Sequence, residues 1–264
     1  MEKQPTVITE NLSTGYITHK KKVVVSCNIN ERLYAGELNI LMGRNGVGKS
    51  TILKTLAAFI PPLEGKVEIL GKDLSLYTPV ELSKIIGVVL TTRLNLTHLT
   101  VKELVATGRS PYTGYWGRLS ADDNNKIEES MALVGISSLS ARTVATLSDG
   151  ERQKTLIAKA LAQETPLIFL DEPTAFLDYP SKVETLVLLK ELARKHNKTI
   201  FLSTHDIEVA IQIADRLWLM DKTNGIMTGT PDYLSETGVI AEFFSTKELR
   251  YNAEDKSFRV MMPD

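Results

Sequence analysis

The sequence has a single cysteine, no long apolar segment and almost no net charge, and each scarcity excludes a class of protein. Cys27 cannot form a disulfide within the chain, so nothing requires an oxidising compartment. No apolar run approaches the roughly 20 residues of a membrane-spanning helix, and the N-terminus lacks the apolar core of a signal peptide. Lys and Arg (31) nearly balance Asp and Glu (32), which argues against binding of nucleic acid through bulk charge. We expect an intracellular protein with no membrane span of its own and no nucleic-acid partner.

The order of apolar and polar stretches predicts the fold class. The 264 residues are 43% hydrophobic, which is enough for a sizeable core. Strand-like and helical stretches alternate, as is typical of an α/β protein whose mostly parallel sheet is covered on both faces. Between about residues 100 and 163 the pattern turns helical, which indicates an inserted helical subdomain. Capping-box spacings open two of its helices, at Thr100 with Glu103 and at Ser120 with Asp123.

The predicted strands cover residues 6–8, 23–27, 38–41, 67–70, 86–90, 167–170, 199–202 and 217–220. Residues 50–58 are predicted to form a helix that ends at Pro61-Pro62, because proline cannot donate to the helical ladder. Residues 245–264 are charged and weakly patterned, and the sequence assigns them no function.

A glycine-rich loop lies between a predicted strand and a predicted helix. Residues 43–50 fit the pattern G-x-x-x-x-G-K-[ST], in which glycines let consecutive N–H groups surround phosphate oxygens. The helix N-terminus adds partial positive charge. We expect Lys49 to reach the β- and γ-phosphates of ATP, and the Ser50 hydroxyl to bind Mg²⁺. The residues of the predicted phosphate cradle are Gly43, Arg44, Asn45, Gly46, Val47, Gly48, Lys49, Ser50 and Thr51.

Ionisable residues follow two other predicted strands. Asp171 and Glu172 follow strand 167–170, and His205 follows strand 199–202. Neighbouring parallel strands deliver their carboxyl ends to one crevice. We therefore expect Asp171 to hold Mg²⁺ through water and Glu172 to polarise the attacking water, while His205 contacts the γ-phosphate. Together with Lys49, Glu172 and His205 are the predicted catalytic residues.

Residues 147–153, LSDGERQ, allow two interpretations. Ser148 with Glu151 has the spacing of a capping box, so the segment could simply start a helix. A helix N-terminus with a free serine and glycine is also a ready anion site. Local chemistry alone favours the capped helix.

The order of these motifs along the chain resembles that of an ABC-type ATPase. The cradle is followed by LSDGERQ, by Asp171-Glu172, by Asp178 and by His205, and the resemblance covers almost the whole chain. It implies an α/β, P-loop NTPase fold of ABC type, with a mostly parallel sheet core, an antiparallel β subdomain and an inserted α-helical subdomain. Residues 1–264 would be one ATPase domain, with a nucleotide-binding core at 1–95 and 164–235. A helical subdomain would cover about 96–163, and a C-terminal extension 236–264.

The resemblance also implies residue roles and a partner. Two copies would pair head to tail as a homodimer around two ATP molecules, and Ser148 and Gly150 of one copy would bind the γ-phosphate held by the other. Asp178 would lie on this interface, and Tyr16 falls where the family places an aromatic that stacks on adenine. Asp149 stands where the family signature more usually has glycine.

One departure from the family pattern follows strand 86–90, where glutamine is usual. This sequence has Thr91-Thr92 there. A threonine oxygen can bind Mg²⁺ or its water, but its reach is shorter than that of glutamine. Thr91 is the preferred equivalent for the metal role, and Thr92 stays open.

Residues 99–119 resemble the stretch that faces the permease in ATPases of the iron-chelate, haem and cobalamin importers. The resemblance implies a peripheral subunit on the cytoplasmic face of the inner membrane, bound to two permease subunits and served indirectly by an extracytoplasmic substrate-binding protein. The cargo stays open among ferric siderophore, haem and cobalamin. The alternative is a soluble ABC-type ATPase of cofactor assembly, nucleic-acid repair or translation. A small-molecule kinase would leave LSDGERQ and Asp178 without a purpose.

Overall fold

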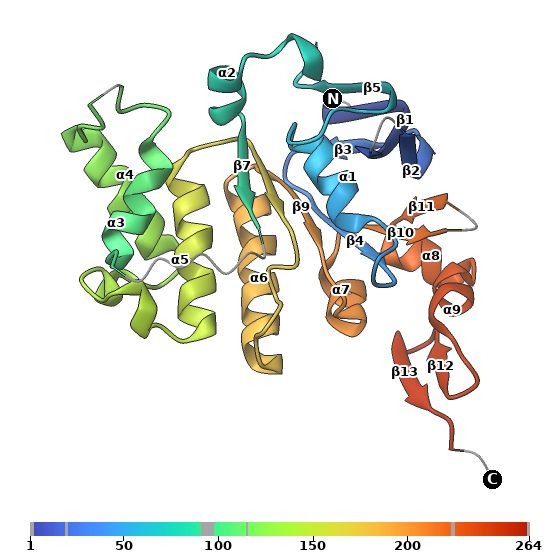
Figure 1. Cartoon of the computed structure of the whole chain (residues 1–264). Coiled ribbons are helices and arrows are strands. Elements are labelled where there is room, and N and C mark those ends of the chain that lie inside the picture. The colour runs from blue at the N-terminus through green and yellow to red at the C-terminus, as the bar shows by residue number, and fades with distance from the viewer. Residues whose placement is uncertain (1–2, 19–20, 91–97, 115, 223–224, 263–264) are drawn as a thin grey trace.

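The computed structural model describes residues 3–18, 21–90, 98–114, 116–222 and 225–262. Its centre is a six-stranded sheet in the order β11-β10-β4-β9-β8-β7 (Figure 1). Neighbouring strands are parallel except β11, which pairs antiparallel with β10. The mostly parallel sheet predicted from the sequence is confirmed. Its strands are β4 (Leu38–Gly43), β7 (Ile86–Val89), β8 (Leu167–Leu170), β9 (Thr199–Ser203), β10 (Arg216–Asp221) and β11 (Gly225–Gly229).

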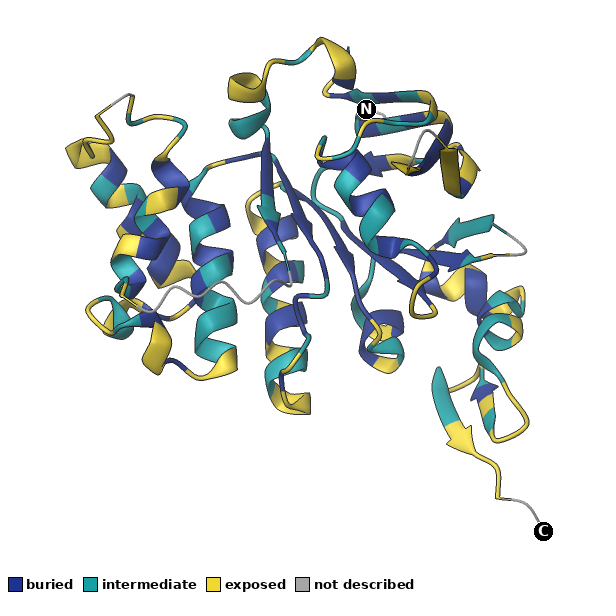
Figure 2. Cartoon of the chain, in the orientation of Figure 1, coloured by how far each residue is buried: buried dark blue, intermediate teal, exposed yellow. Residues whose placement is uncertain are grey.

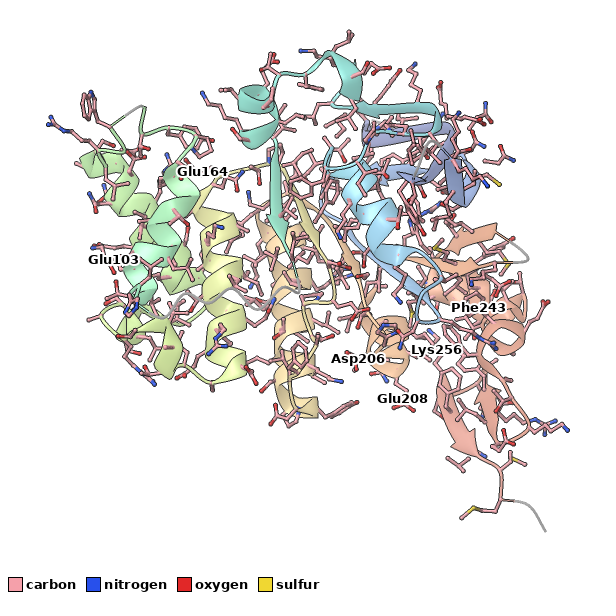
Figure 3. All side chains as sticks on the ribbon, viewed as in Figure 1. Glu103, Glu164, Asp206, Glu208, Phe243 and Lys256 are labelled. Atoms are coloured by element: carbon pink, nitrogen blue, oxygen red, sulfur yellow. The ribbon has the colours of Figure 1, made fainter. Side chains whose placement is uncertain are left out.

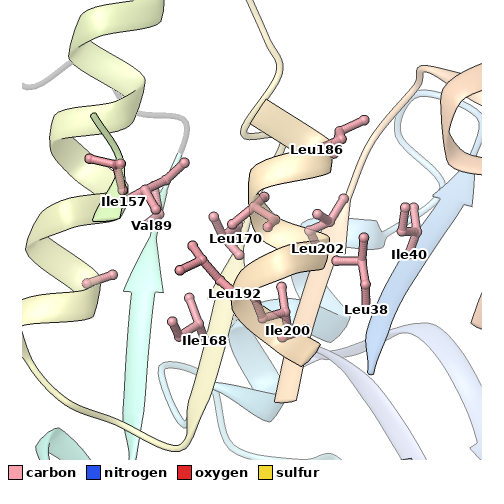
Figure 4. Close-up of a cluster of buried hydrophobic side chains, with 14 of the residues drawn as sticks. Leu38, Ile40, Val89, Ile157, Ile168, Leu170, Leu186, Leu192, Ile200 and Leu202 are labelled. Carbon is pink, nitrogen blue, oxygen red and sulfur yellow. The ribbon is translucent and has the colours of Figure 1, made fainter. Parts of the chain in front are cut away.

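Helices cover both faces of this sheet. Successive strand residues point to opposite sides, and both sets are mostly apolar and buried. On one face, Leu170 lies in a buried cluster with Leu186 and Leu192 of α6 (Figure 4). On the other face, the adjacent Phe169 lies in a cluster with Ile52 of α1. Figure 2 shows the central strands buried almost throughout, so the sheet is the rigid support of the fold. The covering helices are α1 (Lys49–Leu56), α6 (Tyr179–Lys195) and α7 (Ile207–Ile213).

A second sheet is antiparallel, as predicted. Its order is β2-β1-β5-β6, with β3 also paired to β1. Irregularities in register let β1 pair first with β3 and β5 and then with β2, so this strand is much longer than the predicted 6–8. The strands are β1 (Pro5–Thr18), β2 (Lys21–Ile29), β3 (Arg32–Tyr34), β5 (Glu64–Ile69) and β6 (Lys72–Asp73).

Three helices pack together to one side of the central sheet (Figure 1) and form the helical block, α3 (Val101–Ala106), α4 (Ala121–Leu133) and α5 (Asp149–Ala162). Each begins with a capping box at the predicted pair, which is Thr100 with Glu103, Ser120 with Asp123, and Ser148 with Glu151. Arg109 is 3% exposed and donates to Asp123 Oδ1 at 2.8 Å. It also donates to the carbonyl of Ala162 and the carboxylate of Glu164, both at 2.7 Å. This buried cation ties the segment after α3 to α4 and to the end of α5.

Helix α1 ends earlier than the sequence predicted. The expected end was at Pro61-Pro62, but the helix stops at Leu56. Ala58 has a φ of 62°, and the N–H of Phe59 donates to the carbonyl of Lys54. A residue in the left-handed conformation, followed by an N–H that donates to the carbonyl five residues earlier, is a Schellman-type helix end. That turn, and not the prolines, terminates the helix.

The chain after β11 forms structure that its sequence pattern did not predict. Helices α8 (Pro231–Glu236) and α9 (Val239–Phe244) precede an antiparallel hairpin of β12 (Leu249–Asn252) and β13 (Ser257–Val260). The ring of Phe258 packs against those of Phe244 and Tyr251, which holds the hairpin to α9. The remaining helix is the short α2 (Pro79–Ser83). Within the ranges that the structure describes, no helix has both the length and the apolar character to cross a membrane.

Candidate functional site

Three neighbouring strands end at one edge of the central sheet. β4, β9 and β8 lie side by side and run parallel, so their carboxyl ends meet. The glycine-rich loop leads from β4 into α1, Asp171 and Glu172 follow β8, and His205 follows β9. The structure therefore brings the loop, both acids and the histidine to one place.

Backbone conformation explains why the loop contains glycine. Gly46 has a φ of 74° and Gly48 a φ of 121°, which L side chains rarely adopt. A Cβ on Gly48 would also lie 2.0 Å from Cγ1 of Val25 in β2. Val47 is 4% exposed and anchors the loop in the core, while the three residues before it are exposed. The loop is thus held by the buried side chains of Val47 and Lys49, and its residues 44–46 are open to a ligand.

Lys49 is a buried cation at the start of α1, with 5% of its side chain exposed. Its Nζ donates to the carbonyl of Gly43 at 3.0 Å and lies 3.2 Å from His205 Nε2 and 3.8 Å from Glu172 Oε1. Burial lowers the pKa of this ammonium below its ordinary value, although Glu172 and then Asp171 act in the opposite direction. A nearby phosphate would favour the charged form in the same way as these carboxylates.

Glu172 and His205 contact each other directly. Glu172 Oε1 lies 2.5 Å from His205 Nε2, within hydrogen-bond distance. Lys49 can only donate, so Nε2 cannot accept from it while also donating to Glu172. The Glu172 carboxylate and the Lys49 ammonium therefore compete for one imidazole nitrogen. Glu172 also has a φ of 47°, a strained conformation for a residue other than glycine.

Asp171 lies between two serine hydroxyls. Its Oδ1 accepts from Ser50 Oγ at 3.0 Å and from Ser203 Oγ at 2.8 Å. The same Ser203 hydroxyl accepts from the N–H of Glu172 at 3.0 Å, so it supports both acids. Ser203 is fully buried, and the sequence interpretation missed it. Its signal was a polar residue that ends the apolar strand β9.

The LSDGERQ residues lie apart from this cluster. Figure 1 shows α5, which Ser148 caps, and α1 on opposite sides of α6. Ser148 is exposed, and its hydroxyl accepts from the N–H of Glu151, as in an ordinary capping box. A Cβ on Gly150 would lie 3.6 Å from Ser181 Oγ, and the N–H of Ser181 donates to Asp178 at the N-cap of α6. The structure therefore brings Gly150 close to Ser181, the residue that donates to Asp178, and does not place Ser148 beside Lys49, Glu172 and His205 of the same chain.

Tyr16 lies in strand β1, opposite Val23 of β2, and is 48% exposed. Two residues further along β2, Val25 is the side chain that excludes a Cβ at Gly48. One sheet therefore carries Tyr16 and borders the glycine-rich loop. Thr91 and Thr92, the predicted metal-binding alternatives, lie outside the described residues.

A glycine cradle, a buried lysine, an acid pair and a histidine at the ends of parallel strands define a P-loop nucleotide hydrolase. Residues 27–175 match the family profile described as ABC transporter. The chain belongs to this family and is an ABC-type ATPase.

Several named relatives resemble the chain along most of its length. The uncharacterized ABC transporter ATP-binding protein MJ0873 of Methanocaldococcus jannaschii is 41% identical over 92% of this chain and 83% of its own. The iron(3+)-hydroxamate import ATP-binding protein FhuC of Bacillus subtilis is 34% identical over 86% of each chain. The ferric enterobactin transport ATP-binding protein FepC of Escherichia coli is 32% identical over 90% of this chain and 86% of its own.

Solved structures share the fold. The dimeric, post-hydrolysis ATP-binding cassette MJ0796, bound to ADP and Pi, has a TM-score of 0.71 and 29% identity, with 85% of this chain and 98% of the other covered. An inward-facing ABC transporter of proposed metal-chelate type has a TM-score of 0.78 and 28% identity, with 97% and 96% covered. The sequence prediction of an ABC-type fold is confirmed.

Proposed function

We propose that this chain is the ATP-hydrolysing subunit of an ABC importer that carries an iron chelate, with a ferric siderophore favoured over haem or cobalamin. The observation that carries the catalytic part is the convergence of Lys49, Glu172 and His205, with Nζ, Oε1 and Nε2 within 3.8 Å of one another. The cargo is supported by the relatives whose printed names specify ferric enterobactin and iron(3+)-hydroxamate.

ATP would bind with its adenine on Tyr16 and its phosphates in residues 43–51. Ser50 Oγ and Asp171 Oδ1, 3.0 Å apart, offer the hard oxygen ligands that Mg²⁺ prefers. Among the described residues no group of three or more His, Cys, Asp or Glu could hold a metal ion. Oxygens of the ATP phosphates would be further ligands, and so would Thr91 or Thr92. Bound Mg²⁺ would neutralise charge on the β- and γ-phosphates.

Hydrolysis would begin when the γ-phosphate of ATP comes to lie beside Lys49, Glu172 and His205. Lys49 and His205 would turn to the phosphate oxygens, which frees the Glu172 carboxylate from His205. Glu172 would then orient a water for in-line attack and accept its proton, as the bond to the ADP leaving group breaks. The charge that develops on the transferred phosphoryl group would be stabilised by the Lys49 ammonium.

The site would be completed by a second copy of the chain. Ser148 and Gly150 lie at the exposed N-terminal end of α5, where helix N–H groups can bind an anion. In a head-to-tail homodimer they would contact the γ-phosphate held by the partner subunit, with Asp178 on the interface. The dimeric structure of the cassette MJ0796 supports the pairing of two copies.

Two permease subunits would supply the membrane path. A groove of about 380 Å³ between the end of α1, α2 and β7 is lined by Phe59, Leu82 and Val88, with Gln163 at its edge. Phe59 is 58% exposed, and the Tyr112 hydroxyl donates to the carbonyl of Gln163. An exposed apolar groove fits a helix from a membrane partner. The chain would then be peripheral on the cytoplasmic face of the inner membrane, and a substrate-binding protein would act on it only indirectly.

We further propose that residues 1–264 act as one ATPase domain. Residues 1–95 and 164–235 would be its nucleotide-binding core, and about 96–163 its helical subdomain. Residues 236–264 would be a C-terminal extension. Limited proteolysis that released a stable ATP-binding fragment without residues 96–163 would contradict the proposal of a single domain.

The proposed role of Glu172 in ATP hydrolysis is tested by comparing the ATPase activity of the purified wild-type chain with that of Glu172→Gln and Glu208→Gln. Glu208 is an exposed carboxylate in the first turn of α7 (Figure 3), so Glu208→Gln should retain wild-type activity. Glu172→Gln should lose about 10²–10⁴-fold in kcat and accumulate an ATP-bound dimer. Full activity of Glu172→Gln without a dimer would contradict the proposal.

The transport part is tested by recovery of the chain with membranes that contain its permease. Phe59→Asp should lose membrane association and keep basal ATPase activity, because the change charges the apolar groove. Substitutions at Tyr112 should abolish transport driven by ATP and keep basal ATPase activity. Val260→Asp, which charges an exposed residue of the C-terminal hairpin, is the matched control and should still associate. Equal membrane association of Phe59→Asp and Val260→Asp would contradict the groove as docking surface.

A further inference from the structure

Asp206 occupies the N-cap position of α7 but does not cap that helix. An N-cap aspartate ordinarily accepts a hydrogen bond from an N–H of its own helix. Here Oδ2 accepts from Thr174 Oγ1 at 2.6 Å, and Oδ1 accepts from Lys182 Nζ at 2.6 Å. Figure 3 shows Asp206 at the start of α7. The Asp206 carboxylate therefore accepts hydrogen bonds from other segments of the chain and not from the N–H groups of α7.

The partners of Asp206 flank the proposed catalytic pair. Thr174 is two residues after Glu172, and Thr204 directly precedes His205. Both threonines are almost fully buried, and their Oγ1 atoms are 3.1 Å apart. Asp206 Oδ2 accepts from Thr204 as well, at 3.1 Å. One carboxylate oxygen thus holds the segment that carries the base against the segment that carries the histidine.

Lys182 extends this connection to a third segment. It lies in the first turn of α6, and its N–H donates to the carbonyl of Asp178 at 2.9 Å. Only 28% of the Lys182 side chain and 18% of the Asp206 side chain are exposed. Burial would raise the pKa of Asp206, but the hydrogen bonds from Lys182 and Thr174 keep it below its ordinary value. The carboxylate is therefore charged at neutral pH.

We propose that Asp206 and Lys182 are positioning residues for ATP hydrolysis, which hold the Glu172 and His205 segments at their working separation and join both to the helix that Asp178 begins. Neither side chain needs to touch ATP for this role. The inference rests on the catalytic roles proposed above for Glu172 and His205. It adds a path by which a contact at Asp178 would reach the reacting groups.

The test compares two lysines of the same helix in the full-length chain. Lys190 also lies in α6 and forms an ion pair with Asp215 at 2.5 Å, with 17% and 22% of the two side chains exposed. Lys182→Met and Lys190→Met remove the same charge and keep the aliphatic stem. Thermal unfolding reports the shared structural cost of losing a partly buried ion pair.

We expect Lys182→Met to lower kcat by at least about tenfold with the KM for ATP unchanged within about twofold, because only positioning of the reacting groups is lost. Lys190→Met should keep both values. Lys182→Arg, which preserves the ion pair, should recover most of the activity. Asp206→Asn, which keeps an oxygen acceptor but loses the charge, should resemble Lys182→Met and serves as the second variant if that one does not fold.

Equal kcat values for Lys182→Met and Lys190→Met would overturn the inference, and so would a rise in KM with an unchanged kcat. Glu172→Gln measured in parallel separates two failures. If Glu172→Gln is inactive while Lys182→Met and Asp206→Asn are fully active, the positioning role fails and the proposed function stands. If Glu172→Gln remains active, the proposed function itself fails.

Discussion

The central sheet and the helical block place the side chains of the proposed site in opposite ways. At the sheet edge, Lys49, Glu172 and His205 face one another, and the fully buried Ser203 accepts from the N–H of Glu172 and donates to Asp171. In the helical block, Ser148 is exposed. Among the described contacts, its side chain hydrogen-bonds only to the N–H of Glu151 in its own helix. The chain thus completes one half of the proposed site by folding. The other half is turned toward solvent, where a second copy could use it.

The largest effect is expected from the buried cation. Lys49→Met should lower kcat/KM for ATP by at least about a hundredfold, because it removes a preorganised charge from a water-poor site. Steady-state ATP hydrolysis measures this loss. Lys54→Met, in the last turn of the same helix, is the control and should remain active. A loss of less than about threefold in Lys49→Met would show that the sheet-edge cluster is not the phosphate site.

The next effect separates the two interpretations of Ser148. Ser148→Ala and Thr100→Ala each remove the hydroxyl of a capping box in the helical block, which should lower the free energy of unfolding by about 1 kcal/mol in both. Only Ser148→Ala should also lose ATP hydrolysis, by about tenfold or more, because only this hydroxyl would meet phosphate. Chemical denaturation and ATPase assays measure the two quantities. If both variants hydrolyse ATP equally well, Ser148 is a cap and nothing more.

A smaller effect is expected at the edge of the cradle. Tyr16→Ala should raise the KM for ATP about tenfold and leave kcat unchanged, since stacking of a base on an aromatic ring contributes roughly 1–3 kcal/mol. Tyr16→Phe retains the ring and should retain the KM. Titration with ATP at constant Mg²⁺ measures both constants. An unchanged KM for ATP in Tyr16→Ala would show that the adenine does not stack on Tyr16.

The smallest effect on activity, and a large one on stability, is expected at Arg109. Arg109→Met should lower the free energy of unfolding by about 3–5 kcal/mol, because Asp123 would be left charged with 8% of its side chain exposed. Below the unfolding transition kcat should match that of wild type. Lys102→Met breaks an exposed ion pair with Glu128 and should cost less than about 1 kcal/mol. Similar costs for the two variants would show that the helical block does not depend on its buried cation.

The same pair predicts a pH dependence. The Ser120 hydroxyl and N–H, and then Arg109, lower the pKa of Asp123 to about 2. Since this folded-state pKa lies below the ordinary value, the carboxylate stabilises the fold above that value and loses its contribution as pH falls toward 2. The stability difference between wild type and Asp123→Asn should therefore be constant near neutral pH and shrink in strong acid. A difference that stayed constant down to pH about 2 would contradict the assigned cause.

The sequence predicted most of the central sheet and the approach of Lys49, Glu172 and His205 to one another, because periodic apolar strands fix which side chains share an edge. Capping boxes at Thr100, Ser120 and Ser148 were equally readable, since their contacts are local. The end of α1 was missed, because a left-handed Ala58 leaves no sign in the residue type. Ser203 and Lys182 were also missed, because they contact residues 32 and 24 positions away in the chain, which only the tertiary fold brings close. The hairpin after α9 depends in the same way on the ring of Phe258.

The central claim is that each ATP is hydrolysed by groups from two copies, and mixing of two inactive variants tests it most directly. Lys49→Met would disable the cradle, and Ser148→Arg would block the partner-facing half. In a mixed dimer one site would combine the intact cradle of the Ser148→Arg chain with the intact helical block of the Lys49→Met chain. We predict that the mixture hydrolyses ATP well above the sum of the separate variants. A mixture no more active than that sum would contradict the shared site.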